Sequence, residues 1–427
     1  MEEPFRRLGG KLYCEDVAAD ALVAAHGTPL YVYSRTAIVE RYRELDAAFS
    51  GVDRLIAYSV KANGNLSVLR LLAEQGAGAD IVSGGELHRA LLAGIPADRI
   101  VFSGVGKTVV EMAAALEAGI YGFNVESEGE LRALSALAAA TGREAPVALR
   151  INPDIESPTP HAYTRTGHRA TKFGIPSEDA LRLYRLAAAL PGIRVRGVDV
   201  HIGSQIVDVE PYRRALRHVL ELVDAVCREG IELEYLDLGG GFGISYGDGD
   251  DAVISEFAGA LLPELSNSGM RLVLEPGRFI AGPAGVLLTR VLYIKETGEK
   301  TFVITDAGMN DLLRPSHYSG YHAVEPVELH PGRETVPVDV VGPICETGDF
   351  LALDRPLERP EEGELLAIRT AGAYGFSMAS QYNARVRPAE VLVDGDTFRL
   401  IRRRETIDDL VRGEVELLEP AGGDAEP

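Results

Sequence analysis

Cysteines and long apolar runs are both scarce in this sequence. Its 427 residues include three cysteines, Cys14, Cys227 and Cys345, an odd set without the spacing of metal ligands. Their scarcity argues against a secreted disulfide framework, so we expect a cytoplasmic protein without a metal site. No run approaches the ~18 apolar residues that a membrane-spanning helix needs. The opening MEEPFRRLGG also lacks the apolar core of a signal peptide, so a soluble protein without a membrane partner is predicted.

Positive charge is also in short supply. The chain has 43 lysine and arginine residues against 64 aspartate and glutamate residues, a formal net charge of −21. A nucleic-acid backbone would be repelled unless a local basic patch overcame this charge. The one dense basic cluster in the sequence is RLIRRRE at 399–405, and short runs of this kind are typically solvated surface. No nucleic-acid partner is therefore predicted.

Short β-branched apolar runs alternate with alanine- and leucine-rich segments from about residue 55 to residue 285. The apolar runs predict strands, and the segments between them have the period of amphipathic helices, several ending at glycine. Eight strands with intervening helices in about 230 residues fit a closed (β/α)8 barrel better than an open doubly wound sheet. The predicted strands are 55–60, 79–83, 100–104, 122–125, 147–151, 195–202, 235–239 and 271–276.

The pattern changes after residue 285, where strand and turn signals replace the helical ones. We therefore predict an α/β barrel domain over residues 32–285 and a second, mainly β domain, a sandwich or Greek-key barrel. The second domain is expected to span residues 286–420 and to be completed by the N-terminal segment 1–31. The tail 421–427 has the composition of a disordered segment.

Chemically distinctive residues follow four of the predicted strands. Because a barrel of this kind presents its active site at the carboxyl ends of its strands, these side chains should meet at one face. The residues are Lys61 in YSVKAN, His201 in HIGSQ, Gly239, Gly240 and Gly241 in LDLGGGFG, and Glu275 with Arg278 in EPGR.

Lys61 and the glycine turn point to two parts of a cofactor site. Desolvation at the end of a buried strand lowers the pKa of an amine and favours the neutral nucleophile that a Schiff base needs. Taken alone, Lys61 also fits a lysine that reaches solvent from a strand end. The glycine turn exposes consecutive backbone N–H groups that can hold a phosphate, although such a run also makes ordinary tight turns.

Glu275 and His201 suggest which cofactor the site would take. A carboxylate beside a phosphate site needs a cationic partner, and a protonated pyridine nitrogen is one that it would strengthen as an electron sink. A salt bridge between Glu275 and Arg278 is the alternative. His201 offers a flat face for a cofactor ring, or is an ordinary core histidine. Together with Lys61, these residues predict a site for pyridoxal 5'-phosphate (PLP).

These motifs resemble those of a known family, the fold-type III PLP-dependent decarboxylases, and within it the branch that acts on diaminopimelate. YSVKAN is similar to the lysine motif of the family, and HIGSQ to the motif with a ring-stacking histidine and a phosphate-binding serine. GGGFG and EPGR resemble its phosphate and pyridine contacts. Three further segments resemble the substrate and dimer-partner motifs of that branch, namely DAGMNDLLRPSHYSGYH (306–322), GPICETGDFLA (342–352) and AGAYGFSMASQYN (371–383).

The resemblance implies an alanine-racemase-like barrel with a β domain, assembled as a homodimer whose active sites are shared between subunits. It implies decarboxylation of meso-2,6-diaminopimelate to L-lysine and CO2, the last step of lysine biosynthesis by that route. Lys61 would carry PLP, and Cys345 of the neighbouring subunit would protonate the carbanion. The implied cofactor contacts are Lys61, His201, Ser204, Gly240, Gly241, Glu275, Gly277, Arg278 and Tyr374, and the implied substrate contacts are Arg278, Arg314, Tyr318, Glu346 and Tyr374.

Two features depart from the family pattern. Ser59 stands where alanine is common in the lysine motif. HAYTRTGHRATKFGI (161–175) has the general pattern of the family's loop but differs from it in many residues. Neither removes a group with an implied catalytic role, so they affect only how narrowly the substrate is specified.

Three alternatives stay open at this point. Decarboxylases of the same fold that act on ornithine, arginine or a carrier-linked glutamyl group would not need Arg314, Tyr318 and Glu346 together, because those substrates lack a second amino-acid head. A racemase of this fold pairs the pyridine nitrogen with an arginine rather than a carboxylate. A catalytically inactive homologue that serves as a binding partner would not need Lys61 and Cys345.

Overall fold

Two compact units make up the fold in the computed structural model. The residues that it describes are 3–155, 171–247 and 250–418. The first unit contains Ser34–Gly285 and Thr370–Ser377, and the second contains Phe5–Tyr33, Val286–Arg369 and the residues from Met378 onward.

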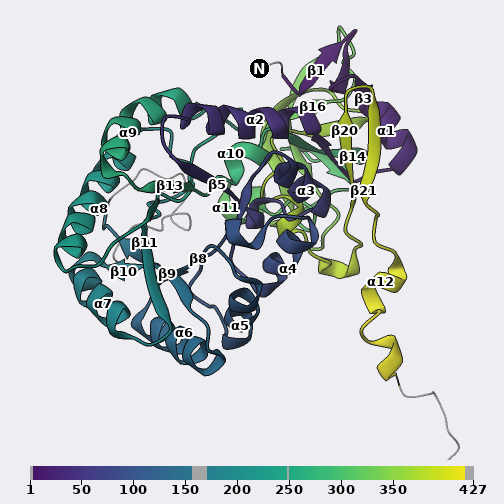
Figure 1. The fold of residues 1–427 in the computed structure, drawn as a ribbon. Coiled ribbons are helices and arrows are strands. Elements are labelled where there is room, and N and C mark those ends of the chain that lie inside the picture. The colour runs from purple at the N-terminus through teal and green to yellow at the C-terminus, as the bar shows by residue number, and fades with distance from the viewer. Residues whose placement is uncertain (1–2, 156–170, 248–249, 419–427) are drawn as a thin grey trace, which may run out of the picture. The chain divides into compact units, whose positions relative to one another are not determined.

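The first unit is built around a closed parallel barrel (Figure 1). Among the described residues, eight strands pair side by side in chain order, and the last of them pairs with the first through Leu272–Leu274 and Arg54–Ile56. This confirms the predicted barrel and each of its eight predicted strands. The strands are β5 (Arg54–Ser59), β6 (Gly78–Ile81), β7 (Ile100–Phe102), β8 (Gly122–Val125), β9 (Ala145–Asn152), β11 (Ile193–Asp199), β12 (Tyr235–Asp237) and β13 (Arg271–Leu274). A short strand, β10 (Ile175–Pro176), adds to β9.

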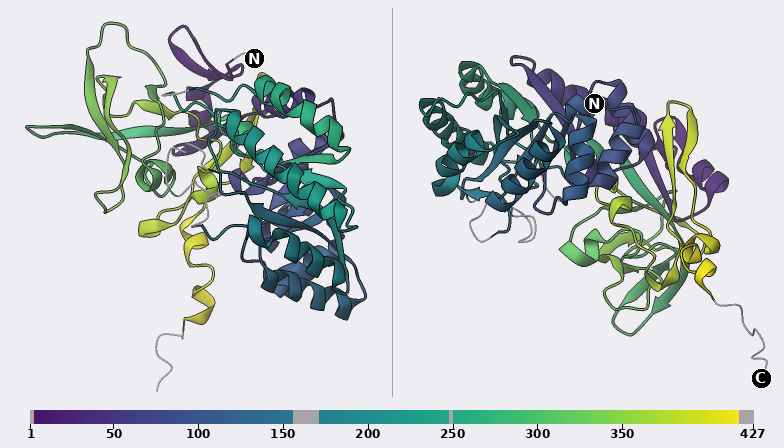
Figure 2. Two further views of the ribbon diagram at one scale, coloured as in Figure 1. Left: turned by 90° about the vertical axis from the view of Figure 1, so that its left-hand side faces the viewer. Right: turned by 60° about the horizontal axis from the view of Figure 1, so that its bottom comes forward.

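Helices surround these strands, and the left view of Figure 2 shows neighbouring ones side by side. Several begin at a serine or threonine cap and end at glycine, as the sequence predicts: the α5 cap is Thr108 and its last turn closes at Gly119 with a left-handed backbone. The helices of this unit are α2 (Arg35–Ala48), α3 (Leu66–Glu74), α4 (Gly84–Leu92), α5 (Val109–Ala118), α6 (Glu128–Thr141), α7 (Ser177–Ala189), α8 (Glu210–Arg228), α9 (Ile254–Ser268) and α10 (Arg278–Ala281).

The interior of the barrel is apolar in one part and polar near the carboxyl ends of the strands. An apolar cluster that includes Leu55, Ala57, Val101 and Val273 fills part of it. Near the carboxyl ends of the strands, however, several side chains are both buried and charged or polar. Burial of such groups is costly unless they are hydrogen-bonded or paired, so this polar layer marks the functional end of the barrel.

The second unit is mainly β. Its large sheet has the order β18-β17-β15-β14-β4-β20-β21, and Figure 2 shows its long strands in green. In addition, β19 pairs with β14, and β16 pairs with β19. A small sheet of β1 (Phe5–Leu8), β2 (Lys11–Cys14) and β3 (Val17–Ala18) and the helix α1 (Ala19–His26) share its apolar core. The large sheet consists of β4 (Leu30–Ser34), β14 (Gly285–Glu296), β15 (Thr301–Thr305), β16 (Val324–Pro326), β17 (Thr335–Val341), β18 (Phe350–Glu358), β19 (Leu365–Ile368), β20 (Ala389–Asp394) and β21 (Thr397–Arg402).

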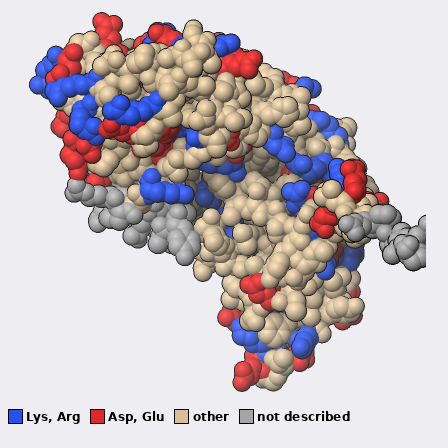
Figure 3. Space-filling model, turned by 90° about the horizontal axis from the view of Figure 1, so that it is seen from below, with Lys and Arg blue, Asp and Glu red and all other residues tan. Residues whose placement is uncertain are grey.

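Basic side chains at the surface are largely matched by acidic ones. On the face drawn in Figure 3, lysine and arginine residues lie interspersed with aspartate and glutamate. The basic run at 399–405 follows the same rule, because Arg402 pairs with Glu390 and Arg403 with Asp409, which lies in α12 (Ile407–Val411). The guanidinium groups of this run therefore serve local structure.

The described residues contain neither a helix suited to span a membrane nor a cluster suited to bind a metal. Among the described helices, none combines the length and the apolar character that crossing a membrane demands. Within the same residues, no group of three or more His, Cys, Asp and Glu side chains is arranged to hold a metal ion.

Candidate active site

The residues singled out at the strand ends lie together at one end of the barrel. A Cβ atom added to Gly239 would lie 2.4 Å from Nδ1 of His201, and one added to Gly240 would lie 2.0 Å from the carbonyl oxygen of Glu275. The loops after β11, β12 and β13 are therefore in direct contact. Lys61 lies in the 3-10 turn Val60–Ala62 after β5, His201 and Ser204 lie after β11, Gly239, Gly240 and Gly241 after β12, and Glu275 after β13.

Lys61 is held by a buried carboxylate. Its Nζ lies 2.5 Å from Oδ2 of Asp80, a fully buried residue of β6. Burial alone would lower the pKa of Lys61, but the charges of Asp80 and Glu275 outweigh burial and raise that pKa. The prediction of a lowered pKa is therefore wrong for this structure, because it considered desolvation and not the neighbouring carboxylates.

Ser59, the departure from the family motif, has a place in this arrangement. Its hydroxyl group bonds to Oδ2 of Asp80 and lies 3.1 Å from the carbonyl oxygen of Glu275. Ser59 thus helps to hold the partner of Lys61. The other departure, the loop 161–175, falls largely on residues 156–170, which lie outside the described residues.

The glycine turn after β12 brings backbone atoms closer than other residues would allow. A Cβ atom on Gly241 would lie 2.3 Å from the carbonyl oxygen of Gly203, and Gly241 has a φ of +98°, which other residues rarely adopt. Gly277, in the loop after β13, is equally confined, since its Cβ atom would lie 2.9 Å from that of Ser59. The result is a rim of closely packed backbone that can approach an anion.

Arg278 extends this rim at the start of α10. Its Nη2 donates to the hydroxyl group of Ser204 at 3.3 Å, and its Nη1 donates to the hydroxyl group of Tyr246. The guanidinium carbon lies 4.8 Å from the centre of the Tyr374 ring, and the backbone N–H of Tyr374 donates to the carbonyl of Ala62 at 2.8 Å. Four of the predicted phosphate contacts, Gly241, Ser204, Arg278 and Tyr374, therefore belong to one continuous edge of the barrel unit.

Glu275 points away from this rim into the barrel. The hydroxyl group of Ser103 and the side-chain amide of Asn124 both donate to its Oε1, at 3.1 and 3.3 Å. Burial, followed by the charge of Asp80, raises the pKa of Glu275 to about 7. A carboxyl group with a pKa near neutrality is well suited to share a proton with a ring nitrogen, whose cationic form it would stabilise.

His201 is uncharged in this setting. Burial, followed by the charges of Arg150 and Lys61, lowers the pKa of His201 well below its ordinary value. A neutral imidazole presents a flat face without a second positive charge, which suits packing against a cationic ring.

Of the predicted substrate residues, Arg314, Tyr318 and Glu346 lie in the second unit, whereas Arg278 and Tyr374 lie in the first. Arg314 is buried at the start of α11 (Arg314–Tyr318), and Nη1 lies 2.6 Å from Nε2 of His322. Because a guanidinium group can only donate, Nε2 of His322 accepts and its Nδ1–H donates to the carbonyl oxygen of Arg369 at 2.8 Å. His322 thereby orients Arg314. Tyr318 ends the same helix and is partly exposed.

Cys345 and Glu346 are exposed in the loop between β17 and β18. The backbone N–H of Cys345 donates to Oδ1 of Asn383 at 2.8 Å, and the hydroxyl group of Tyr382 donates to Glu346 at 2.9 Å. This loop lies beside α11, because a Cβ atom on Gly348 would be 3.2 Å from Glu346 and 3.5 Å from Ser316. Arg314, Tyr318, Cys345 and Glu346 therefore belong to one region of the second unit.

Comparison with known proteins gives the family to which these motifs belong. Residues 35–282 match the family described as pyridoxal-dependent decarboxylase, pyridoxal binding domain. The chain is 50% identical to diaminopimelate decarboxylase of Neisseria meningitidis serogroup B over 96% of its own length and 98% of the relative's. It also resembles the crystal structure of diaminopimelate decarboxylase from Helicobacter pylori complexed with L-lysine, with 42% identity, a TM-score of 0.90, and 93% and 100% of the two chains covered. The chain belongs to the diaminopimelate decarboxylase family.

A relative with the same fold and lower sequence identity acts as a comparison for this decarboxylase. The lysine/ornithine decarboxylase of Vibrio vulnificus is 25% identical to it, with a TM-score of 0.78 and 88% of this chain covered. The structure of that enzyme was determined with putrescine. Identity to the two diaminopimelate decarboxylases named above, 50% and 42%, is therefore higher than identity to this relative.

The cofactor of the family is PLP, and the decarboxylase has the groups to hold it. The glycine rim with Ser204 and Arg278 offers N–H, O–H and guanidinium donors to a phosphate, and Glu275 offers a carboxylate to a ring nitrogen. Lys61 offers an amine that can bond to the aldehyde carbon of the cofactor. Added Cβ atoms would block the rim at Gly240 and Gly241, so the site requires glycine there.

Six buried polar residues of this end of the barrel were not singled out in the sequence. The signal was present, because each is a polar residue at or near the end of an apolar run that was identified as a strand, where only a partnered group can be buried. They are Asp80, Ser103, Asn124, Arg150, Asp199 and Asp237.

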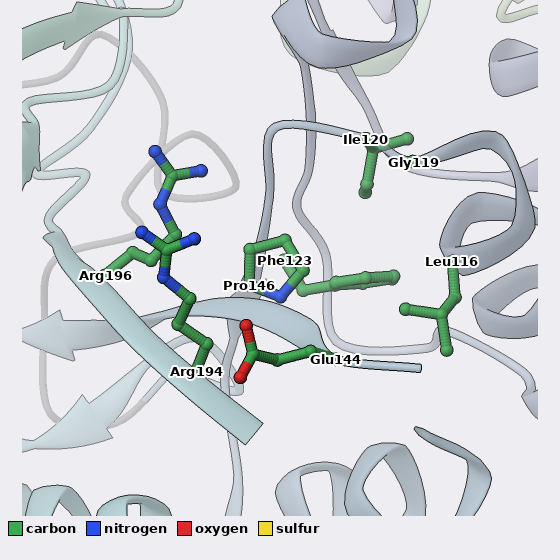
Figure 4. Close-up of a pocket in the computed structure, with 8 residues that line it drawn as sticks. All are labelled: Leu116, Gly119, Ile120, Phe123, Glu144, Pro146, Arg194 and Arg196. Atoms are coloured by element: carbon green, nitrogen blue, oxygen red, sulfur yellow. The ribbon is translucent and has the colours of Figure 1, made fainter. Parts of the chain in front are cut away.

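A pocket of about 200 Å³ lies at the opposite end of the barrel, where strands β8, β9 and β11 begin (Figure 4). Apolar side chains such as Leu116, Ile120 and Phe123 line it together with Arg194 and Arg196. Both guanidinium groups are paired with Glu234, at 2.6 and 2.7 Å. Their charge is thus already matched, and active sites of such barrels lie at the carboxyl ends of the strands, so we do not assign the active site to this pocket.

We expect Gly240→Ala to weaken PLP binding by about tenfold or more, because the added Cβ must displace the backbone of Glu275 or the glycine turn. The control is Gly259→Ala in α9, where a Cβ meets no atom within 4 Å. That change should stabilise the protein by roughly 0.5–1 kcal/mol, because alanine favours a helix over glycine. Titration with PLP followed by absorbance measures the affinity, and a Gly240→Ala variant that binds PLP like wild type would contradict the proposed rim.

Proposed function

We propose that this chain is a diaminopimelate decarboxylase, which converts meso-2,6-diaminopimelate to L-lysine and CO2 in the last step of lysine biosynthesis. The observation that carries the proposal is the presence of an amine, Lys61, and a buried carboxylate, Glu275, together at the carboxyl ends of the strands of a closed barrel. A racemase of this fold would place an arginine opposite the ring nitrogen. The full-length identity to enzymes of this name supports the choice of substrate.

PLP supplies an aldehyde carbon that bonds to amines and a protonated ring that accepts the electrons left by the departing CO2. Lys61 would hold the cofactor through a covalent bond from its amine. Because this amine must lose a proton before it can bond, the neighbouring carboxylates of Asp80 and Glu275 would be the groups placed to accept that proton. Glu275 would keep the ring nitrogen protonated, and His201 would support the face of the ring.

The remaining roles fall to the second unit. The distal carboxylate of the substrate is bound by Arg314, which His322 orients, together with Tyr318 and Arg278 of the barrel. Glu346 is the partner of the distal amine. A bidentate guanidinium fork suits a carboxylate, and a phenol adds a neutral donor. Cys345 returns a proton to the α-carbon as the carboxylate leaves as CO2. One proton thus replaces one CO2, and the thiol is restored from water.

We further propose a cytoplasmic homodimer in which Cys345 and Glu346 reach the active site of the neighbouring subunit. Both residues are exposed on their own chain, although their proposed roles require contact with substrate. The loop after β7 and the start of α5 offer apolar surface for an interface, since Val105, Val109 and Val110 are exposed. Cys14, Cys227 and Cys345 are free thiols, which agrees with a reducing compartment.

The proposal is tested by offering purified protein with PLP a panel of diaminopimelate, lysine, ornithine and arginine, and measuring CO2 release. We expect release from diaminopimelate to exceed release from the other three. Faster release from ornithine or arginine would replace the proposed substrate, and no release from any of them would favour a binding protein over an enzyme.

We expect Arg314→Ala to lower kcat/KM for diaminopimelate. The loss of transition-state stabilisation should be about 2–4 kcal/mol, the range for removing one member of a desolvated charge pair. Ornithine lacks the distal carboxylate, so any activity on it should fall much less, and the preference between the two substrates should narrow. Both rates are measured on the same variant.

The control for this prediction is His322→Ala. It removes the hydrogen bond to Arg314 and creates a buried gap, but it leaves the guanidinium group. We expect it to lower the melting temperature while diaminopimelate stays preferred. If Arg314 only braces the β unit, the two variants should lose stability alike and neither should change the preference.

A further inference from the structure

Asp237 connects two parts of the cofactor site. It is the last residue of β12 and is fully buried. Its Oδ1 accepts the backbone N–H of Gly239 at 2.9 Å, which holds the start of the glycine turn. Its Oδ2 accepts a hydrogen bond from the side-chain amide of Asn124 at 3.2 Å. One side chain therefore reaches both the turn and the interior of the barrel.

The carboxyl groups of Asp237 and Glu275 meet at this amide. The same nitrogen of Asn124 lies 3.3 Å from Oε1 of Glu275, so two buried carboxyl groups contact one amide nitrogen. Two ionised carboxylates this close together in a buried site repel each other, so a single proton on the pair is favoured.

The neighbouring charges decide which residue carries the proton. Glu275 faces the cations Lys61 and Arg150 as well as the anion Asp80. Asp237 faces the anions Glu275 and Asp199, and burial, followed by the charges of these two groups, raises the pKa of Asp237 well above its ordinary value. The negative charge is thus better placed on Glu275, beside the cations, and the proton on Asp237.

We propose that Asp237 is a positioning residue that stays protonated and donates a hydrogen bond to Glu275, while its other oxygen holds the glycine turn. This inference rests on the proposed function in so far as Glu275 serves the cofactor ring. A neutral Asp237 leaves a single negative charge on the pair. Ser103 and Asn124 donate to Oε1 of Glu275, and Asp237 adds a third donor to the carboxylate that serves the ring nitrogen.

Asparagine at position 237 distinguishes a protonated acid from a carboxylate anion. Its amide oxygen can accept from Gly239 and its amide nitrogen can donate to Glu275, but that nitrogen cannot accept from Asn124 as Oδ2 of Asp237 does. Asp237→Asn keeps two of the three contacts and should bind PLP within about threefold of wild type. Asp237→Ala removes all three contacts, and losing a hydrogen bond to a charged group should weaken PLP binding by about tenfold or more. Affinities are measured by absorbance titration with PLP alone, so no substrate enters the test.

The PLP-free protein provides a second measurement. Because burial raises the pKa of Asp237 in the folded state, the folded protein holds a proton that the unfolded chain has lost, and stability should fall as pH rises above the unfolded pKa. Asp237→Asn has no such proton, so its melting temperature should fall less between pH 6 and pH 9. Ser103→Ala removes a hydroxyl group that donates to Glu275 and accepts from Asn124 but leaves Asp237 in place, so it should keep the dependence on pH that comes from Asp237.

The outcomes separate this inference from the proposed function. If Asp237→Asn weakens PLP binding as much as Asp237→Ala, or melts with the same dependence on pH as wild type, Asp237 acts as an anion and the inference is overturned. Should Asp237→Ala not fold, a loss of about tenfold in PLP affinity in Asp237→Asn alone has the same meaning. A different substrate in the decarboxylation panel would overturn the proposed function and leave this result in place.

Discussion

Lys61→Ala is expected to abolish both decarboxylation and the visible absorbance of the covalently bound cofactor. Among the proposed cofactor contacts Lys61 alone has an amine, and a neutral amine is what bonds to the aldehyde carbon of PLP. Turnover should fall by a factor of about a thousand or more, because attachment, exchange with the substrate and release all pass through this amine. Absorbance spectra of the protein with PLP, and CO2 release from diaminopimelate, measure the two effects.

The control for this prediction is Lys61→Arg. It keeps a cation beside Asp80, which is fully buried and would otherwise lose its partner at a cost in stability. An arginine cannot form the covalent bond, so the variant should lose absorbance and turnover while melting closer to wild type than Lys61→Ala. Retained absorbance in either variant would show that another group attaches the cofactor.

Cys345→Ala is expected to have the second largest effect. If Cys345 returns the proton to the α-carbon, its loss should lower kcat by about 10²–10⁴, the range for a positioned proton donor. The absorbance of bound PLP should stay unchanged, since the thiol has no part in cofactor attachment. Cys227→Ala on α8 is the matched control, because it removes an exposed thiol that has no proposed role and should leave kcat as it is.

Mixing the two inactive variants tests whether active sites are shared. If Cys345 serves the neighbouring subunit, a heterodimer of Lys61→Ala and Cys345→Ala chains contains one site with both residues intact. Random pairing makes half of the dimers mixed, each with one of two sites restored, so activity should return to about a quarter of wild type. No recovery, with mixed dimers demonstrated by mass, would place both residues in the same subunit.

Much of the site was predictable because parallel barrels bring strand ends together. Lys61, His201, Glu275 and the glycine turn were found by asking which unusual residues follow each strand, without knowledge of any contact. Their environment was not predictable in the same way. The pKa of Lys61 is raised because Asp80 lies on the neighbouring strand. Burial at the end of its own strand, considered alone, predicts a lowered pKa.

The second unit shows the same limit. The motifs around Arg314 and Cys345 were read from resemblance, but nothing in them pairs Arg314 with His322 or Cys345 with Asn383. These contacts join loops whose paths depend on how the sheet is assembled. A pattern of alternating apolar residues predicts strands, but it does not predict which loops become neighbours.

The fold class, the eight barrel strands and the positions of the candidate cofactor residues could be predicted from the amino-acid pattern, because periodicity and strand ends are properties of the chain alone. Which carboxyl groups face one another inside the barrel depends on the folded arrangement. Asp80, Asp237 and Glu275 are separated by up to 195 positions, yet their charges interact because closure of the barrel buries them together. Proton affinity depends on distance and burial, so the protonation of Lys61, Asp237 and Glu275 is a property of the fold.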